Sequence, residues 1–306
     1  MISYIFWRLL RTVPVVLVVV TIIFGLFRMV PGDPARLIAG TTATEESVER
    51  VRTQLGLDRP LAVQYVTYLA GLPQGRLGYS GTYRGDVGPV IVRHLPPTLA
   101  LLVSALVVTV VLGIPAGVLA AVYRGSAIDY AVSFFVTSML AIPNFWLGLM
   151  MISLFSVSLG WLPSFGYGDW RSLIMPTIAV AARLVAIVAR MARSSMLEVL
   201  GRDYVRTARA KGVRTSTVVV KHALRNALIP TVTTIGLQAG YLLGGSVVIE
   251  QLFAWPGLGQ LLINSVGARD FNMIQSITVV FAAGFLIINL IVDLLYVVIN
   301  PRIEYR

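Results

Sequence analysis

The chain has 306 residues, of which 57% are hydrophobic and only 13% are charged, and its mean hydropathy is +0.81. A water-soluble core cannot use that much apolar surface, so the composition predicts an all-α protein with several membrane-spanning helices. The formal net charge of +11 does not indicate nucleic-acid binding, because the basic residues fall in polar segments beside apolar runs. The absence of cysteine excludes a disulfide framework, a thiol nucleophile and a cysteine metal site.

The first predicted element is an uncharged run, Thr12–Phe27, which follows Arg8 and Arg11 and ends at Arg28. A basic region followed by an apolar one is also typical of a signal peptide. No cleavage site flanked by small residues follows, however, since the chain continues with Val-Pro-Gly-Asp-Pro. We therefore expect residues 1–30 to contain the N-terminus and an uncleaved first span, with the N-terminus inside the cell.

Residues 31–97 form a polar region of nearly balanced charge, which we expect to be an extracellular insertion between the first two spans. Thr44 is placed to cap a helix over Glu45–Leu55, which Gly56 ends. A second helical stretch, Leu61–Leu69, leads into a segment rich in glycine and proline. This segment offers little hydrophobic core, which favours contact with a partner protein. The alternative is a small cap that covers the helices.

Residues 98–306 are predicted to form the membrane core, including the remaining spans and a long polar loop. The apolar runs predict five further spans, at about Thr98–Tyr123, Asp129–Leu159, Ser172–Ala192, Asn226–Ile249 and Met273–Ile299. Pro143 is expected to kink the third of the six spans, because proline removes a helix hydrogen-bond donor and crowds the preceding turn.

Three polar residues near or within these runs are candidates for lining a translocation pathway: Asn144, Arg183 and Gln238. Arg183 interrupts the fourth span, and a charged side chain is costly at the bilayer centre unless it faces a polar cavity or reaches the interface. Two roles for Arg183 stay open at this point, namely pathway lining and extension to the inner interface near Arg190.

Small residues mark one face of the fifth span, where Gly236, Gly240 and Gly244 repeat every fourth residue. Such a face permits close approach of another helix. The approaching helix can belong to a second subunit or to this chain.

A basic segment, residues 193–226, separates the fourth and fifth spans. Between Arg190 and Arg225 the sequence has nine Arg or Lys residues against two acids. Cytoplasmic loops of membrane proteins carry such an excess of positive charge, and the flipped topology would place this loop outside. We therefore predict six spans with both termini inside.

The same segment has the signals for two short helices. Asp203 is placed to cap a helix over Tyr204–Lys211, and Gly212 can close it in a left-handed conformation. Thr215 or Ser216 can cap a second helix. An ordinary cytoplasmic loop is the alternative, but two helices around one glycine favour a docking element.

The motif Arg206-Thr207-Ala208, followed by Gly212, resembles the EAA loop of ABC importer permeases. The stretches DYVRTARAKG and HALRNALIP, together with PGDP, GRLGYS and FAWPGLG, are similar to the B-type permease of dipeptide and oligopeptide importers. The general loop pattern has Glu in place of Arg206 and Leu-Pro in place of Leu224-Arg225. An arginine at the first position of the motif, as at Arg206, resembles the peptide-transporter branch of the family. The resemblance covers essentially the whole chain.

This resemblance implies the fold of a type I ABC importer permease that carries di- or oligopeptides inward. It implies a coupling helix that docks in a groove of a cytoplasmic ATPase, formed by Asp203, Tyr204, Val205, Arg206, Thr207, Ala208, Arg209, Ala210, Lys211 and Gly212. The insertion would reach an extracellular peptide-binding protein, with the candidate contacts Gln74, Arg76, Tyr79, Tyr83 and Arg84. The implied assembly also has a second homologous permease and two ATPase subunits, in a bacterial or archaeal plasma membrane.

The chain itself does not carry the residues for ATP hydrolysis. A P-loop requires Gly-Lys-Ser/Thr, and the two lysines, Lys211 and Lys221, stand in other contexts. ATP and Mg²⁺ are therefore expected on the partner ATPases, and we find no catalytic, cofactor-binding or metal-binding residues. In the predicted topology His94 and His222 lie on opposite sides of the membrane and cannot share a metal.

Two alternatives to a peptide importer stay open. The same architecture can serve another solute, such as nickel or glutathione. A stand-alone secondary transporter or channel fits the sequence less well, because such a protein would require charged relay residues in several spans.

Overall fold

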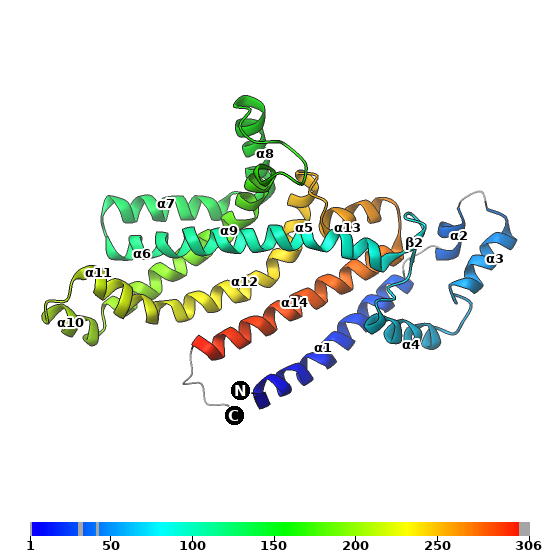
Figure 1. Cartoon of the computed structure of the whole chain (residues 1–306), viewed down its shortest axis with the longest axis horizontal. Helices are drawn as coiled ribbons and strands as arrows, with labels where there is room; N and C mark the ends of the chain where they lie inside the picture. The colour runs from blue at the N-terminus through cyan, green and yellow to red at the C-terminus, as the bar shows by residue number, and fades with distance from the viewer. Residues whose placement is uncertain (1, 30–32, 41–42, 300–306) are drawn as a thin grey trace. The chain divides into compact units, whose positions relative to one another are not determined.

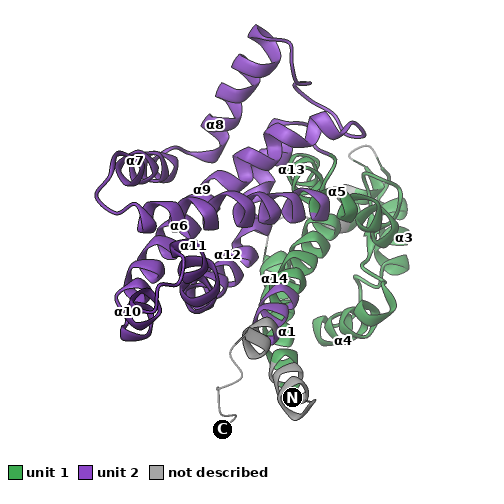
Figure 2. Cartoon of the chain, turned by 60° about the vertical axis from the view of Figure 1, so that its left-hand side comes forward, with its two compact units in different colours: residues 1–98, 256–286 green, residues 99–255, 287–306 purple. Residues whose placement is uncertain are grey.

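The computed structural model describes residues 2–29, 33–40 and 43–299. It divides into two compact units (Figure 2). The first consists of Met1–Thr98 and Pro256–Leu286, and the second of Leu99–Trp255 and Ile287–Arg306.

Most of the described chain is helical (Figure 1), which confirms the predicted all-α fold class. Among the described residues, five helical segments are long and apolar enough to cross a membrane, namely Thr12–Met29, Val87–Val122, Trp170–Leu200, Thr215–Leu252 and Phe271–Val292. A bent pair of helices, Ala127–Ala141 with Asn144–Ser158, provides a sixth. These six segments follow the order of the six predicted spans, whereas the side of the membrane on which each terminus lies stays a prediction.

The first unit combines spans with short helices and one hairpin. It contains α1 (Ile2–Met29), α2 (Pro34–Ala39), α3 (Glu45–Gln54), α4 (Leu61–Gly71), the 3₁₀ turn η1 (Leu72–Gln74), β1 (Tyr79–Ser80), β2 (Gly85–Asp86) and α13 (Leu258–Gly267), with the first parts of α5 (Val87–Val108) and α14 (Phe271–Ile299). The strands pair antiparallel, with Tyr79 opposite Asp86 and Ser80 opposite Gly85. Apolar side chains of α5, α13 and α14 form a core around Val87, Ile91, Leu258, Leu261, Met273 and Ile277.

The predicted capping of α3 is confirmed. The Thr44 hydroxyl accepts a hydrogen bond from the Ser47 backbone N–H at 3.3 Å, and Gly56 follows the helix with φ +65°. The Arg52 guanidinium ties α3 to Asp33 at 2.7 Å, and this carboxylate raises the pKa of Arg52. Asp33 in turn caps α2 by accepting from the Ala35 N–H.

The second unit is built around α9 (Trp170–Leu200), which packs against helices on several sides. The unit also contains η2 (Thr109–Gly113), α6 (Ile114–Val122), α7 (Ala127–Ala141), α8 (Asn144–Met151), η3 (Ile152–Ser158), α10 (Asp203–Ala210), α11 (Thr215–Thr217), η4 (Val218–Leu224) and α12 (Arg225–Leu252), with the remaining parts of α5 and α14. The segments η2, η3 and η4 are π-helical.

The prediction that the fourth span ends near Ala192 was wrong, since α9 continues to Leu200. Of the residues in the most apolar stretch of α9, 72% are buried within the chain. The arginines that made the run look short lie on the surface of α9: Arg183 and Arg190 are exposed and line open cavities, and Arg193 forms an ion pair.

Two glycines of the second span allow α6 and η2 to approach α9 closely. A Cβ atom on Gly117 would lie 2.3 Å from the Ala189 carbonyl oxygen and 2.9 Å from the Arg193 nitrogen. One turn earlier, a Cβ atom on Gly113 would lie 3.1 Å from the Val185 carbonyl oxygen. These backbone distances mean that the contact depends on the absence of a side chain at Gly117.

The third span is broken where we predicted only a kink. α7 ends at Ala141, α8 begins at Asn144, and the two helical parts meet at an angle of 104°. Ile142 and Pro143 both have extended backbone, with ψ of 125° and 135°. Proline disfavours the helical conformation of the residue before it, so two consecutive non-helical residues interrupt the helix.

The second span begins earlier than predicted. Helical structure starts at Val87, passes Pro96 and Pro97 and continues to Val122, whereas we expected a start near Thr98.

The glycine face of the fifth span is used within the chain at one end. A Cβ atom on Gly236 would lie 2.1 Å from the Val292 Cγ1 of α14, whereas a Cβ atom on Gly244 would meet nothing within 4 Å. The part of the face near Gly244 is therefore open in the isolated chain.

Candidate functional site

The predicted docking helix is present as α10, a short exposed helix that begins at Asp203. The prediction that Asp203 caps it was wrong by one residue, because Arg202 occupies the cap position, where its side chain accepts no hydrogen bond. Asp203 lies instead in the first turn, where a carboxylate suits the helix dipole. It forms an ion pair with Arg206 at 3.4 Å.

The end of α10 is closed as predicted by Gly212, which has φ +75°. The Gly212 N–H donates to the Arg209 carbonyl at 2.9 Å, and the Val213 N–H donates to the Ala208 carbonyl at 3.3 Å. This pair of bonds is the Schellman motif, which requires a left-handed residue at the glycine position. The turn after α10 is therefore fixed by backbone hydrogen bonds.

One side of α10 is anchored and the rest is exposed. Val205 is fully buried, and Ala208 one turn later is half-buried. The remaining predicted docking residues are exposed: Asp203, Tyr204, Arg206, Thr207, Arg209, Ala210, Lys211 and Gly212. The helix lies against α9 and η4, and the Asn226 side-chain amide donates to the Tyr204 hydroxyl at 2.8 Å. Most of α10 is therefore accessible to a partner, while Val205 and Tyr204 attach it to the rest of the unit.

The second predicted helix starts at Thr215 with Arg214 in the cap position, so neither Thr215 nor Ser216 acts as the cap. It has no break, because α11, η4 and α12 follow one another without a gap from Thr215 to Leu252. Val219 and Ala223 of η4 pack in a core with Met196 of α9. Residues next to α10 are thus in the same long helix as the fifth span.

The three predicted pathway residues lie together. Asn144 of α8, Arg183 of α9 and Gln238 of α12 line one open cavity of about 370 Å³. Its other described lining residues are Val180, Leu184, Ile187, Tyr241, Leu242 and Gly245, and none of these is acidic. The sequence placed these three residues on separate spans, and the packing of α8 and α12 on α9 brings them to one surface.

An ion pair that the sequence analysis missed joins α7 to α9. The Arg193 guanidinium donates to both Asp129 oxygens, at 2.7 and 2.8 Å. The Gly125 N–H also donates to this carboxylate at 3.0 Å, and the Ser133 hydroxyl does so at 3.4 Å. The Asp129 side chain is only 5% exposed. Because the partners are 64 residues apart, no local pattern indicates this pairing.

The candidate contacts with a binding protein separate into two groups in the first unit. Tyr83 and Arg84 lie in the hairpin turn, where Tyr83 is 46% exposed and Arg84 has φ +51°. Gln74, Arg76 and Tyr79 instead line a cavity of about 620 Å³ beside α4.

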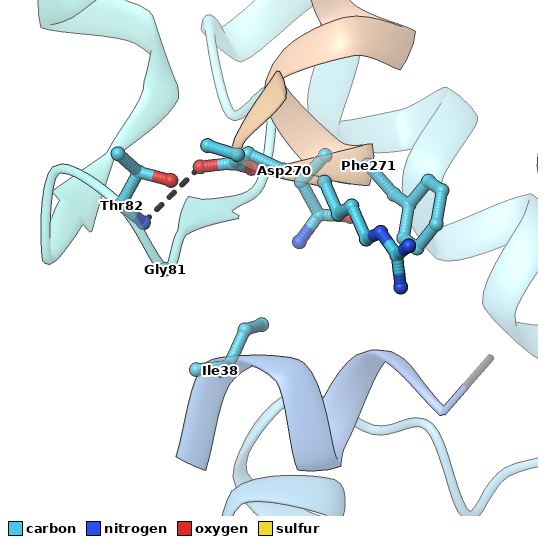
Figure 3. Close-up of a pocket in the computed structure, with 8 residues that line it drawn as sticks. Ile38, Gly81, Thr82, Asp270 and Phe271 are labelled. Carbon is cyan, nitrogen blue, oxygen red and sulfur yellow. Dashed lines mark hydrogen bonds between the residues drawn. The ribbon is translucent and has the colours of Figure 1, made fainter. Parts of the chain in front are cut away.

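The hairpin is attached to the start of α14 by a buried carboxylate that the sequence did not reveal. Asp270 accepts a hydrogen bond from the Thr82 N–H (Figure 3). It also accepts from the Ser80 hydroxyl and from the Met273 N–H, the latter at 3.1 Å. It therefore caps α14 and holds the turn that carries Tyr83. Ile38 faces Gly81 across the small cavity beside this carboxylate.

Within the described residues there is no group of three or more His, Asp or Glu side chains that could hold a metal ion.

Comparisons with known proteins agree with this architecture. Residues 113–305 match the family described as binding-protein-dependent transport system inner membrane component, and residues 1–102 match the N-terminal family of such membrane components. The glutathione transport system permease protein GsiC of Escherichia coli strain K12 is 46% identical over 306 residues, which is 100% of both chains. The protein of that name from Shigella dysenteriae serotype 1 has the same identity and coverage.

Two solved structures are similar in fold. An inward-facing structure of the MetNI methionine ABC transporter is 25% identical, with a TM-score of 0.58, and the match covers 69% of this chain and 96% of that chain. An amino acid ABC transporter crystallised with histidines is 16% identical, with a TM-score of 0.52, over 70% and 94% of the two chains.

Permeases of this type are multi-pass membrane proteins without catalytic activity, and they work with ATPase subunits and a binding protein. The full-length match, the six apolar helical segments and the exposed α10 agree on one assignment. This chain belongs to the binding-protein-dependent transport system inner membrane component family and is the permease subunit of an ABC importer.

Proposed function

We propose that this permease moves short peptides inward through the cavity that Asn144, Arg183 and Gln238 line. The observation that carries the proposal is this convergence of one cation and two amides from three helices. The 46% identity to a glutathione permease supports a peptide-like solute. Glutathione is itself a small modified tripeptide, so it is the second candidate substrate.

The chemistry of the cavity suits a peptide. A guanidinium can hold a carboxylate through two parallel hydrogen bonds, and amide side chains can both donate to and accept from a peptide backbone. Because the described lining carries one positive charge and no acid, a peptide C-terminus would enter without repulsion. Glutathione has two carboxylates and would match this polarity as well.

Coupling to ATP would pass through α10. Its exposed residues would dock on a cytoplasmic ATPase, while Val205 and the Tyr204–Asn226 hydrogen bond would transmit displacement to the chain behind it. That chain includes α12, whose Gln238 and Tyr241 line the cavity. The path is a continuous helix with a packed anchor, so it needs no chemistry in this chain.

The assembly we propose contains a second homologous permease, two ATPase subunits that bind ATP and Mg²⁺, and an extracellular binding protein. The open surface near Gly244 is a candidate face for the second permease. Tyr83 and Arg84 are the candidate contacts for the binding protein, because the hydrogen bonds of Asp270 to Ser80 and Thr82 hold their turn in place.

The proposal is tested by uptake of labelled dipeptides, oligopeptides and glutathione into liposomes that contain the whole importer. Arg183→Gln should lower uptake of the transported solute by about tenfold, as expected for loss of one charged contact. Arg183→Lys should retain part of the uptake. Arg171→Gln is the matched control, since Arg171 lies on the same helix and outside this cavity.

Two results would decide against the proposal. Normal uptake by Arg183→Gln at normal subunit amounts would show that the solute does not pass through this cavity. Uptake of none of the peptides, with transport of an unrelated solute, would reject the substrate class.

A further inference from the structure

The largest cavity described above lies in the first unit and has an unusual charge. It measures about 620 Å³ and gathers Arg28, Arg59 and Arg76, with no acidic residue in its described lining. Amide and hydroxyl groups also line it, from Gln54, Gln64, Gln74, Asn272, Gln275, Tyr68 and Tyr79. A cavity with this composition is suited to an anion.

Three other arginines of the same unit are neutralised by acids. Arg36 pairs with Glu45, Arg50 pairs with Glu46, and Arg52 pairs with Asp33 and Glu49. Within the described part of the chain, no ion pair involves Arg28, Arg59 or Arg76. The positive charge of the cavity is therefore available to a ligand.

The position of α4 places this cavity at the membrane surface. α4 carries no charge, and it packs on the last turns of α1, beside which it lies in Figure 1. The Tyr65 hydroxyl is hydrogen-bonded to the Thr21 hydroxyl, and the rings of Tyr65 and Tyr68 lie 5.3 and 5.8 Å from that of Phe24. At 1.5 Å per residue, Thr21 lies about 10 Å along the helix from Arg28.

Exposed apolar side chains lie on α1 and α4, two helices that contribute to the lining of the cavity. On α4, Leu61 is 61% and Val66 is 63% exposed, and on the same end of α1, Ile22 and Leu26 are 55% and 58% exposed. Since the apolar run of α1 ends near Arg28, this guanidinium is expected at the level of the lipid head groups. Exposed apolar side chains at that depth face acyl chains rather than water.

We propose that this cavity binds the phosphate of an anionic phospholipid, which Arg28, Arg59 and Arg76 hold while the acyl chains cover the exposed faces of α1 and α4. Gln74 supplies a further hydrogen-bond donor beside the phosphate. A soluble anion would use the same cations, but it would leave the exposed apolar side chains of α1 and α4 uncovered. Both the depth of α4 and the charge of the cavity thus favour a lipid.

Native mass spectrometry of the whole importer, released from vesicles that contain phosphatidylglycerol and phosphatidylethanolamine, tests the proposal. The wild type should retain phosphatidylglycerol in preference to phosphatidylethanolamine. Arg59→Gln and Arg76→Gln should each weaken this retention about fivefold, the contribution expected for one cation near an anionic lipid. Arg50→Gln is the matched control, because it removes an equal charge from the same unit outside the cavity.

The outcomes separate the possible ligands. Equal loss in Arg50→Gln, or no loss in an Arg59→Gln/Arg76→Gln double variant, would overturn the proposal. Displacement of the lipid by an equal concentration of inorganic phosphate would assign the site to a soluble anion. Loss of binding-protein association with unchanged lipid retention would assign the surface to that protein. Because lipid retention is measured without transport, failure here is distinguishable from failure of the peptide proposal.

Discussion

Replacement of Gly212 separates the conformation of the docking helix from its contacts. Gly212 has φ +75°, and a Cβ atom added there would meet nothing within 4 Å. The cost of a side chain is therefore conformational and amounts to about 1–2 kcal/mol for alanine in the left-handed region. Asparagine tolerates this region better, and β-branched valine tolerates it worse.

This ranking predicts a graded loss of coupling. Gly212→Asn, Gly212→Ala and Gly212→Val should progressively disturb the two hydrogen bonds that close α10, at Gly212 and Val213. A cost of about 1–2 kcal/mol changes the population of the closed turn by about 5- to 30-fold. ATP hydrolysis should then proceed with falling peptide uptake per ATP, while the amount of assembled importer stays normal.

The assay is the ratio of uptake to ATP hydrolysis in liposomes with the complete importer. Gly125→Ala is the matched control, because Gly125 also has a positive φ, of +77°, and open space around its Cβ position, but lies in the turn before α7. Equal ratios for all three Gly212 variants and the wild type would show that coupling does not depend on the left-handed conformation of Gly212. A loss of assembled importer in proportion to the loss of uptake would contradict the prediction as well.

Three further predictions follow from packing and charge. Gly117→Ala should reduce the amount of folded protein in the membrane, because its Cβ atom would lie 2.3 Å from a backbone oxygen of α9. Gly25→Ala should leave that amount unchanged, since nothing lies within 4 Å of its Cβ position. Equal amounts of the two variants would contradict this prediction. Asp129→Asn and Arg193→Gln should each lower the stability of the detergent-solubilised protein by about 2 kcal/mol. The double variant should lose less stability than the sum of the two single losses. Strict additivity in thermal unfolding would show that the two side chains act independently. Val205→Asp should release α10 and abolish ATPase binding in co-purification, because a carboxylate would replace a fully buried side chain; retained binding would place the anchor elsewhere.

The local features of the fold were predictable because their causes lie within a few residues. Apolar runs determine the spans, Thr44 supplies an oxygen for the first turn of α3, and Gly212 supplies the left-handed end of α10. The break at Ile142–Pro143 was underestimated, because the sequence shows where a helix is weakened but not how far its two parts turn.

The remaining features depend on residues far apart in the chain. Arg193 looked like a loop cation, since its partner Asp129 lies 64 positions earlier. Asp270 and Ser80 are 190 positions apart, so no local pattern in the sequence indicates the hydrogen bond that attaches the hairpin to α14. For the pathway, polarity alone selected Asn144, Arg183 and Gln238, and only the packing around α9 shows that they share a cavity.

We propose that α10 is the surface through which the permease meets its ATPase. Because the chain contains no cysteine, Ala210→Cys places a single thiol on the exposed side of this helix, and a thiol-linked photocrosslinker then reports what lies beside it in membranes. We predict that Ala210→Cys forms adducts with an ATPase subunit, and that Arg50→Cys in the first unit does not. Adducts with the ATPase from Arg50→Cys but not from Ala210→Cys would contradict the account.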